Sequence, residues 1–235
     1  MAFLTFRGGI HPNDGKDLSK NCPVEKYLPK GDLAILVSQH IGAPAKPIVK
    51  KGDHVLAGQK IAEAGGFVSA PIHSSVSGTV KGIEKRLTAV GAMGDAIIIE
   101  NDGLYESVEY TPATLSDLSR EDILKRIQEG GVVGQGGAGF PTHVKLSPKE
   151  PDKIDYILVN GAECEPYITS DYRRMMEEPE SIVGGLEVIL KAFPKAVGCI
   201  CIEDNKPDCI ARMKEAIKGK ERMEVKELKT KYPQG

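Results

Sequence analysis

Residues 130–145, GGVVGQGGAGFPTHVK, form the segment whose composition best suits an anionic or planar ligand. Six glycines in ten residues exclude a helix interior, because each glycine costs about 1 kcal/mol there relative to alanine. Without Cβ atoms, successive backbone N–H groups can approach a ligand closely and form a nest for phosphate. Phe140 can stack on a planar ring, and Lys145 can neutralise phosphate charge. The alternative interpretation is a flexible connector.

A second polar segment, VNGAECEPYITSDYR at residues 159–173, begins in a predicted strand and continues past its carboxyl end. Ligands of open α/β sheets bind outside the carboxyl ends of the strands. Carboxylates and an amide at this place can bind ribose or ribityl hydroxyls, or a nicotinamide carboxamide. The alternative interpretation is a solvated acidic loop that caps the next helix. The candidate residues are Asn160, Glu163, Glu165 and Asp171.

Alternating helix and strand patterns after residue 118 predict the sheet that positions these segments. Ser119, with Asp122 at N3, begins a helix as a capping box, and Gly130–Gly131 ends it. Pro179 separates two predicted helices, since proline interrupts a helix. The order β-α-β-α-β predicts a parallel sheet of three or more strands with crossover helices. The predicted strands are 155–160, 196–203 and 223–228, and the predicted helices are 170–178, 180–193 and one that begins at Pro207.

Short β-branched runs punctuated by glycine fill residues 33–100 and predict a small all-β barrel or sandwich. The halves KPIVKKGDHVLAGQKIAE and SAPIHSSVSGTVKGI resemble a biotinyl/lipoyl-like barrel-sandwich hybrid. Carrier forms present a modified lysine between the halves, where this chain has Gly65-Gly66-Phe67, so we expect a structural or docking role. The predicted domains are an irregular N-terminal arm (1–30), a barrel-sandwich hybrid (31–103) and an α/β nucleotide-binding domain (116–235). A three-stranded α/β sheet is small, so we expect this last domain to be truncated at its carboxyl end.

Bulk composition excludes several classes of protein. The net charge of −2 does not indicate the basic surface that binds nucleic acid. No window reaches the ~18 apolar residues that a membrane span needs. The N-terminus lacks an apolar run with a cleavage site, so we expect a cytoplasmic chain. Five cysteines without C-x-x-C spacing argue against a metal centre in this stretch, and Cys199 and Cys201 are expected to pack in a strand. The histidines share no ligand spacing, and no catalytic acid, base or nucleophile is indicated.

Together the two polar segments resemble the flavin domain of the NADH-oxidising 51-kDa subunit of respiratory complex I. In that family a G-x-G-G-A-G-F-P-T loop holds NADH and FMN, and an N-x-x-E-x-E-P segment completes the pocket. The matches here are GQGGAGFPT at 134–142 and NGAECEP at 160–166, with Ala162 where the family has an acidic flavin contact. The resemblance implies that Gly134, Gly136, Gly137, Phe140, Lys145, Glu165 and Asp171 contact NADH, that Gly139 and Thr142 shape the loop, and that Asn160 and Glu163 face FMN.

The motif FRGGIHP at residues 6–12 and the β-rich segment resemble RnfC, the peripheral subunit of the Rnf ferredoxin:NAD+ oxidoreductase. This resemblance implies hydride transfer between NAD(H) and FMN, then one-electron transfer with [4Fe-4S] clusters in a C-terminal part that this chain lacks. It also implies membrane subunits and a ferredoxin-like subunit as partners, ion pumping, and a peripheral place on the inner face of the cell membrane. Two alternatives remain: a cobalamin reductase-like flavoprotein of a microcompartment, which shares the flavin motifs, and a non-catalytic docking fragment.

Overall fold

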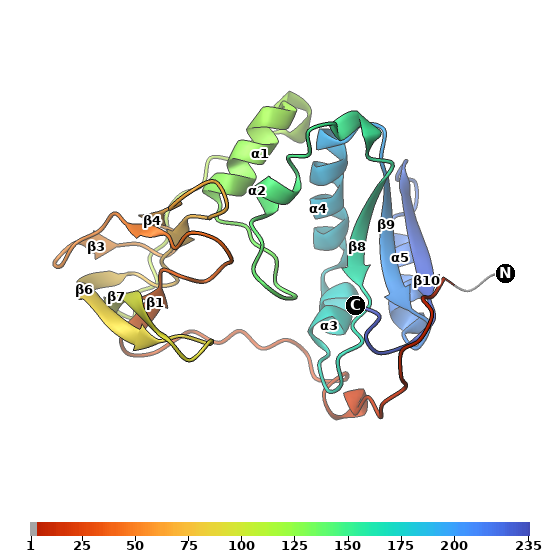
Figure 1. Cartoon of the computed structure of the whole chain (residues 1–235), viewed down its shortest axis with the longest axis horizontal. Helices are drawn as coiled ribbons and strands as arrows, with labels where there is room; N and C mark the ends of the chain where they lie inside the picture. The colour runs from red at the N-terminus through yellow and green to blue at the C-terminus, as the bar shows by residue number, and fades with distance from the viewer. Residues whose placement is uncertain (1–3) are drawn as a thin grey trace. The chain divides into compact units, whose positions relative to one another are not determined.

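The computed structural model describes residues 4–235, and the chain forms two compact units (Figure 1). One unit, called the α/β unit below, combines residues 4–26 with residues 150–235. The other, called the β-sandwich unit, consists of residues 27–149. The N-terminal arm is thus divided between the two units. The domain bounds expected from the sequence stay a prediction.

The β-sandwich unit is built from two small antiparallel sheets, as predicted. Apolar side chains of the strands form the core between the sheets, and Val55, Ile61, Ile97 and Ile99 are fully buried. Burial of this apolar surface is the main source of stability for so small a sandwich. The four-stranded sheet has the order β1 (Leu33–Leu36), β7 (Met93–Asn101), β6 (Gly78–Leu87), β3 (His54–Val55), and the three-stranded sheet has the order β2 (Lys46–Pro47), β4 (Lys60–Glu63), β5 (Ile72–His73).

Helix α1 (Arg120–Glu129) and the short helix α2 (Thr142–Lys145) complete the β-sandwich unit. The predicted capping box of α1 is confirmed: the Asp122 N–H donates to Ser119 Oγ at 3.1 Å, and the Ser119 N–H donates to the Asp122 carboxylate at 3.0 Å. The helix ends before Gly131, whose φ of +64° favours glycine. A Cβ there would lie 2.5 Å from the Pro71 carbonyl oxygen, so the chain passes close to the sandwich.

The α/β unit contains the predicted parallel sheet, in the order β10-β9-β8 (Figure 1). Pro179 separates two helices and Pro207 begins a third, as predicted. The interior of the unit is apolar, with Leu186, Ile200 and Ile202 almost fully buried. The strands are β8 (Tyr156–Gly161), β9 (Val197–Glu203) and β10 (Met223–Leu228), and the helices are α3 (Ser170–Glu177), α4 (Pro179–Ala192) and α5 (Pro207–Ala216).

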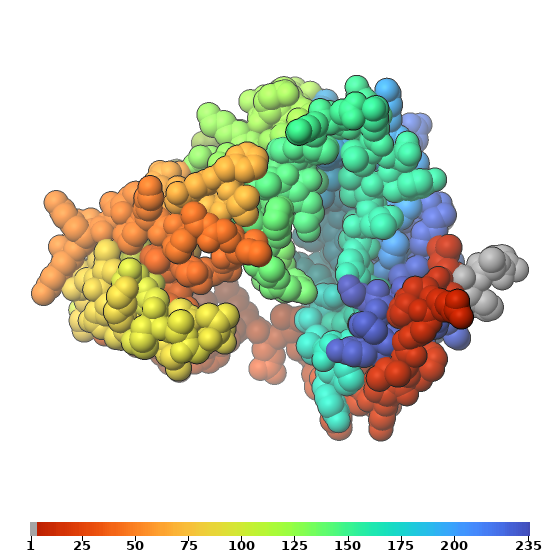
Figure 2. Space-filling view, in the orientation of Figure 1, coloured from red at the N-terminus to blue at the C-terminus, as the bar shows by residue number. Residues whose placement is uncertain are grey.

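Residues 4–10 lie along the carboxyl-terminal residues of the α/β unit, an attachment that the sequence did not predict (Figure 2). Leu4 forms a parallel bridge with Leu228, and Ile10 forms an antiparallel bridge with Tyr232. The arm is otherwise irregular, as predicted, apart from the short 3₁₀ helix Lys16–Leu18. Across residues 4–235, the structure has no helix with the length and hydropathy of a membrane span.

Gly185 in α4 and Gly198 in β9 give a test of the fold. Gly185 lies inside the helix, and a Cβ added there meets no atom within 4 Å. We therefore expect Gly185→Ala to raise the free energy of unfolding by about 0.5–1 kcal/mol, measured by urea denaturation, because glycine loses more backbone entropy on folding. The contrasting variant is Gly198→Ala in β9, where a Cβ would lie 2.7 Å from Leu186 and should destabilise the unit. A loss of stability in Gly185→Ala would contradict the helix assignment.

Candidate functional site

The glycine-rich loop is closed at its base and anchored near its tip. Val133 and Pro141 form an antiparallel bridge, and the Gly134 N–H donates to the Phe140 carbonyl at 2.9 Å. Near the tip, the Ile41 N–H donates to the Ala138 carbonyl at 2.9 Å. The first two contacts join the ends of the loop to each other, and the third attaches its tip to Ile41. The geometry therefore favours a loop held in one conformation over a flexible connector.

The glycines of the loop fall into two groups. Gly139 has a φ of +63°, and a Cβ there would lie 2.9 Å from the Gln39 carbonyl oxygen, so the fold itself requires glycine. Gly136 and Gly137 have ordinary φ values, and a Cβ on either meets no protein atom within 4 Å. Gly134 would make only an ordinary contact, 3.6 Å from the Phe140 nitrogen. The fold does not require glycine at these three positions, which points to a ligand.

The middle of the glycine-rich loop presents free backbone N–H groups. Residues 135–138 are exposed, and within residues 4–235 none of their N–H groups has a hydrogen-bond acceptor. Consecutive free N–H groups in a glycine-rich loop form an anion-binding concavity. Lys145, exposed on α2, adds a positive charge eight residues past Gly137, and Phe140 is half-buried. Thr142 is the first residue of α2, an element that we did not predict.

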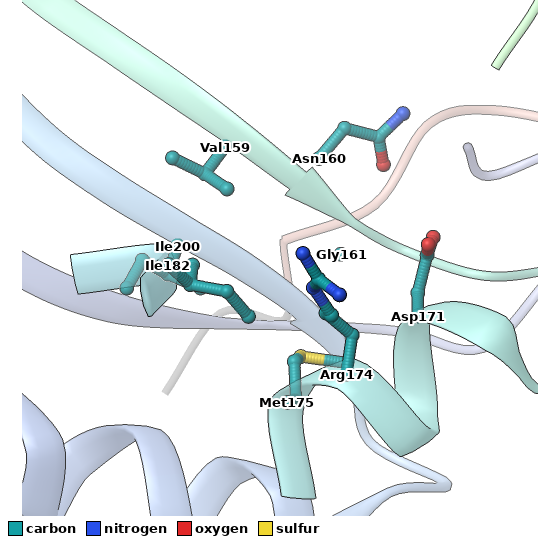
Figure 3. Close-up of a pocket in the computed structure, with 8 residues that line it drawn as sticks. All are labelled: Val159, Asn160, Gly161, Asp171, Arg174, Met175, Ile182 and Ile200. Atoms are coloured by element: carbon teal, nitrogen blue, oxygen red, sulfur yellow. The ribbon is translucent and has the colours of Figure 1, made fainter. Parts of the chain in front are cut away.

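The structure brings two of the four predicted residues after β8 to one cavity. Asn160 lies near the end of β8 and Asp171 lies on α3, and both line a cavity of about 190 Å³ (Figure 3). Arg174, also on α3, lines the same cavity and pairs with Glu178 at 3.3 Å. Polar groups thus lie at one end of a mostly apolar hollow. The other lining residues are Val159, Gly161, Met175, Ile182 and Ile200.

Glu163 is buried and caps helix α3. Its carboxylate accepts the N–H of Asp171 at 2.7 Å, the hydroxyl of Ser170 at 3.2 Å and the N–H of Tyr172 at 3.3 Å. Only 6% of Glu163 is exposed, and burial raises the pKa of its carboxyl group above the ordinary value of 4.5. Glu163 thus caps the next helix, which is the role that the alternative interpretation gave to this segment. Its expected role toward FMN stays a prediction.

Glu165 and Asn160 make contacts with the C-terminal residues. Glu165 is exposed, and its carboxylate is hydrogen-bonded to the Tyr232 hydroxyl, which raises the pKa of that tyrosine. Asn160 is also exposed and donates to the Gly235 carbonyl at 3.0 Å, while its own side-chain oxygen accepts the Ala162 N–H at 3.1 Å. Both side chains are therefore close enough to the surface to meet a ligand.

A buried ion pair lies beside this segment, and we did not predict it from the sequence. Lys206 and Glu203 are 3% and 0% exposed, and their charged groups lie 3.1 Å apart. The Lys206 ammonium also donates to the Glu163 carbonyl at 3.2 Å and to Asn205 at 3.0 Å. The second carboxylate oxygen of Glu203 accepts the Lys231 N–H at 3.1 Å. The pair is fully hydrogen-bonded, as a buried charge must be, and it ties the loop after β8 to β9. No local spacing signals it.

The predicted site residues divide between the two units. The loop residues Gly134, Gly136, Gly137, Gly139, Phe140, Thr142 and Lys145 belong to the β-sandwich unit, and Asn160, Glu163, Glu165 and Asp171 belong to the α/β unit. Each set is ordered within its own unit. That the two sets meet in one pocket stays a prediction.

Comparison with known proteins assigns both parts of the chain. Residues 127–235 match the Nuo51 FMN-binding domain, and residues 4–104 match the RnfC barrel sandwich hybrid domain. These are the two kinds of domain that the motifs predicted, a flavin-binding domain and a barrel-sandwich hybrid domain. More particularly, over 98% of its length the chain is homologous to RnfC, the C subunit of ion-translocating oxidoreductase complexes, so the RnfC resemblance is confirmed.

Three relatives illustrate this homology. The chain is 46% identical to the C subunit of the proton-translocating ferredoxin:NAD(+) oxidoreductase complex of Clostridium ljungdahlii, over 98% of this chain and 51% of that protein. It is 44% identical to the C subunit of the Na(+)-translocating complex of Acetobacterium woodii (98% and 53%), and 37% identical to the C subunit of the ion-translocating oxidoreductase complex of Haemophilus influenzae (98% and 36%). The chain thus spans about half the length of the first two relatives. An NAD+-reducing [NiFe]-hydrogenase matches with 21% identity and a TM-score of 0.40 over 47% of this chain and 21% of that chain, too low a likeness to bear on the argument.

The buried carboxylate of Glu163 predicts a pH dependence of stability. Because its pKa is raised in the folded state, this group stabilises the fold most below pH ~4.5 and loses that contribution as the pH rises through the folded pKa. Glu163→Gln cannot ionise, so it lacks this dependence. We expect the stability of the unsubstituted protein relative to the variant to fall as the pH rises above about 4.5, measured as unfolding free energies. A difference that is constant or grows with pH would show that burial does not dominate at Glu163.

Proposed function

We propose that the chain binds FMN and NAD(H) and takes part in electron transfer between them, as a subunit of a ferredoxin:NAD+ oxidoreductase coupled to ion translocation. The match of residues 127–235 to an FMN-binding domain supports the flavin. The single observation that carries the proposal is the exposed row of unpaired N–H groups at residues 135–138, in a loop whose central glycines the fold does not require. Such donors suit the phosphate of FMN or the pyrophosphate of NAD(H).

The proposed division of labour follows the chemistry of each side chain. The N–H groups beside Gly136 and Gly137 would bind phosphate, Lys145 would balance its charge, and Phe140 would stack on a base. Glu165 and Asp171, both exposed, would accept hydrogen bonds from ribose hydroxyls. FMN, when bound, supplies the exchange between two-electron hydride transfer and one-electron transfer. The protein's own work is to bind and orient, and none of the proposed contacts requires it to donate or remove a proton.

The partners in the proposal come from the printed names of the relatives. These are subunits of complexes that translocate protons or Na(+) and use ferredoxin and NAD(+). We propose that this chain likewise works with membrane subunits and a ferredoxin-like subunit, at the inner face of the cell membrane. The [4Fe-4S] clusters that would exchange single electrons with the flavin are proposed to lie outside this chain.

A pair of matched glycine variants tests the proposed binding site. Gly136→Ala and Gly185→Ala both add a methyl group where no protein atom lies within 4 Å, so both should fold. Only the first methyl group stands where the phosphate is proposed to bind. We expect Gly136→Ala to weaken NAD+ binding to the FMN-loaded protein at least about tenfold, equivalent to ~1.4 kcal/mol, in a calorimetric titration. Gly185→Ala should bind as the unsubstituted protein does. Equal affinities in all three proteins would contradict the assigned loop.

A further inference from the structure

The N-terminal arm grips the loop that follows β8. Within the α/β unit, residues 14–19 of the arm contact residues 165–169 at several points. The Tyr167 N–H donates to the Asp14 carbonyl at 2.6 Å, and the Ser19 hydroxyl donates to the Tyr167 carbonyl at 3.2 Å. Ser19 Oγ also lies 2.9 Å from Thr169 Oγ1. We call this set of contacts the arm clasp.

Lys16 is the centre of the arm clasp. Only 7% of the residue is exposed, although it belongs to an otherwise largely exposed arm. Its ammonium donates to the Glu165 carbonyl at 2.9 Å and to the Ile168 carbonyl at 2.5 Å. It also lies 3.9 Å from the carboxylate of Glu163, the group that caps α3. One buried cation therefore closes the turn between Glu165 and Ile168 and faces the anion that begins the next helix.

The gripped loop is held in a conformation that it would not adopt freely. Tyr167 has a φ of +67°, in the left-handed region that residues with a side chain rarely occupy. Such residues persist where the surroundings determine them, and they gather at functional sites. The surroundings here are supplied by the arm: a Cβ at Gly15, whose φ is +57°, would collide with the Tyr167 ring. The ring and the arm are thus packed against each other at the point of strain.

We propose that Lys16 is a positioning residue for the nucleotide-binding segment 160–171, because it fixes the backbone from which Glu165 and the start of α3 project. The proposal rests on the function proposed above for Glu165 and Asp171. Lys16 itself is buried and donates to the backbone carbonyls of Glu165 and Ile168. Its effect is on the geometry of the segment, so the affinity for NADH depends on a residue nearly 150 positions away in the sequence.

The test compares Lys16→Met, Lys16→Arg and the control Lys26→Met, which changes an exposed lysine of the same arm. Hydrogen exchange, measured residue by residue, reports the loop directly through the Tyr167 N–H. In Lys16→Met we expect this exchange to accelerate at least about tenfold while the amides of Cys199 and Ile200 in β9 keep their rates. In the FMN-loaded protein we expect KM for NADH to rise at least about tenfold with kcat changed less than about threefold. Lys16→Arg should restore most of both effects, and Lys26→Met should change neither.

Several outcomes would overturn the proposal. An unchanged Tyr167 amide, uniform acceleration through β9, or a faster loop with an unchanged KM would each show that Lys16 does not position the segment. Should Lys16→Met fail to fold, Ser19→Ala removes a milder part of the clasp and must show the same local exchange pattern and a smaller rise in KM. Failure of the unsubstituted protein to oxidise NADH through FMN would contradict the proposed function instead, and the exchange pattern would still decide whether the clasp holds the loop.

Discussion

The α/β unit depends on one electrostatic arrangement, the buried carboxylate of Glu163 between the first N–H groups of α3 and the ammonium of Lys16. A carboxylate in so buried a place is stable only if it is hydrogen-bonded and faces positive charge. The helix terminus supplies part of that positive charge and the N-terminal arm supplies the rest. The turn from β8 into α3, which carries Glu163 and Glu165, is therefore fixed by a residue from the far end of the chain.

The glycine-rich loop meets a different requirement. Within residues 4–235 the N–H groups of residues 135–138 have no acceptor, yet hydrogen bonds elsewhere in the loop hold it in place. The bridge between Val133 and Pro141 and the bond from Ile41 to Ala138 hold its ends and its tip. The glycine at 139 serves this fold, while those at 136 and 137 leave space above the backbone. The motif thus contains one glycine that the fold requires and two that the fold does not require.

Local signals in the sequence predicted helix boundaries in both units. The Ser119–Asp122 capping box, Pro179 and Pro207 marked helix boundaries where the structure has them. Strand β9 was equally clear, because its apolar run is buried on both sides. What the sequence could not predict depends on contacts between distant residues. Lys16 and Glu163 lie far apart in the chain, and Glu163 caps a helix that begins seven residues later, outside any local capping pattern.

One spectroscopic measurement tests the proposed flavin chemistry of this chain most directly. The protein is loaded with FMN, freed of unbound flavin and mixed anaerobically with NADH while the flavin absorbance is followed. If the chain binds FMN and NADH as proposed, the bound flavin bleaches, with one NADH oxidised per FMN. Retention of FMN without bleaching would contradict the NADH site, and failure to retain FMN at all would contradict the central claim.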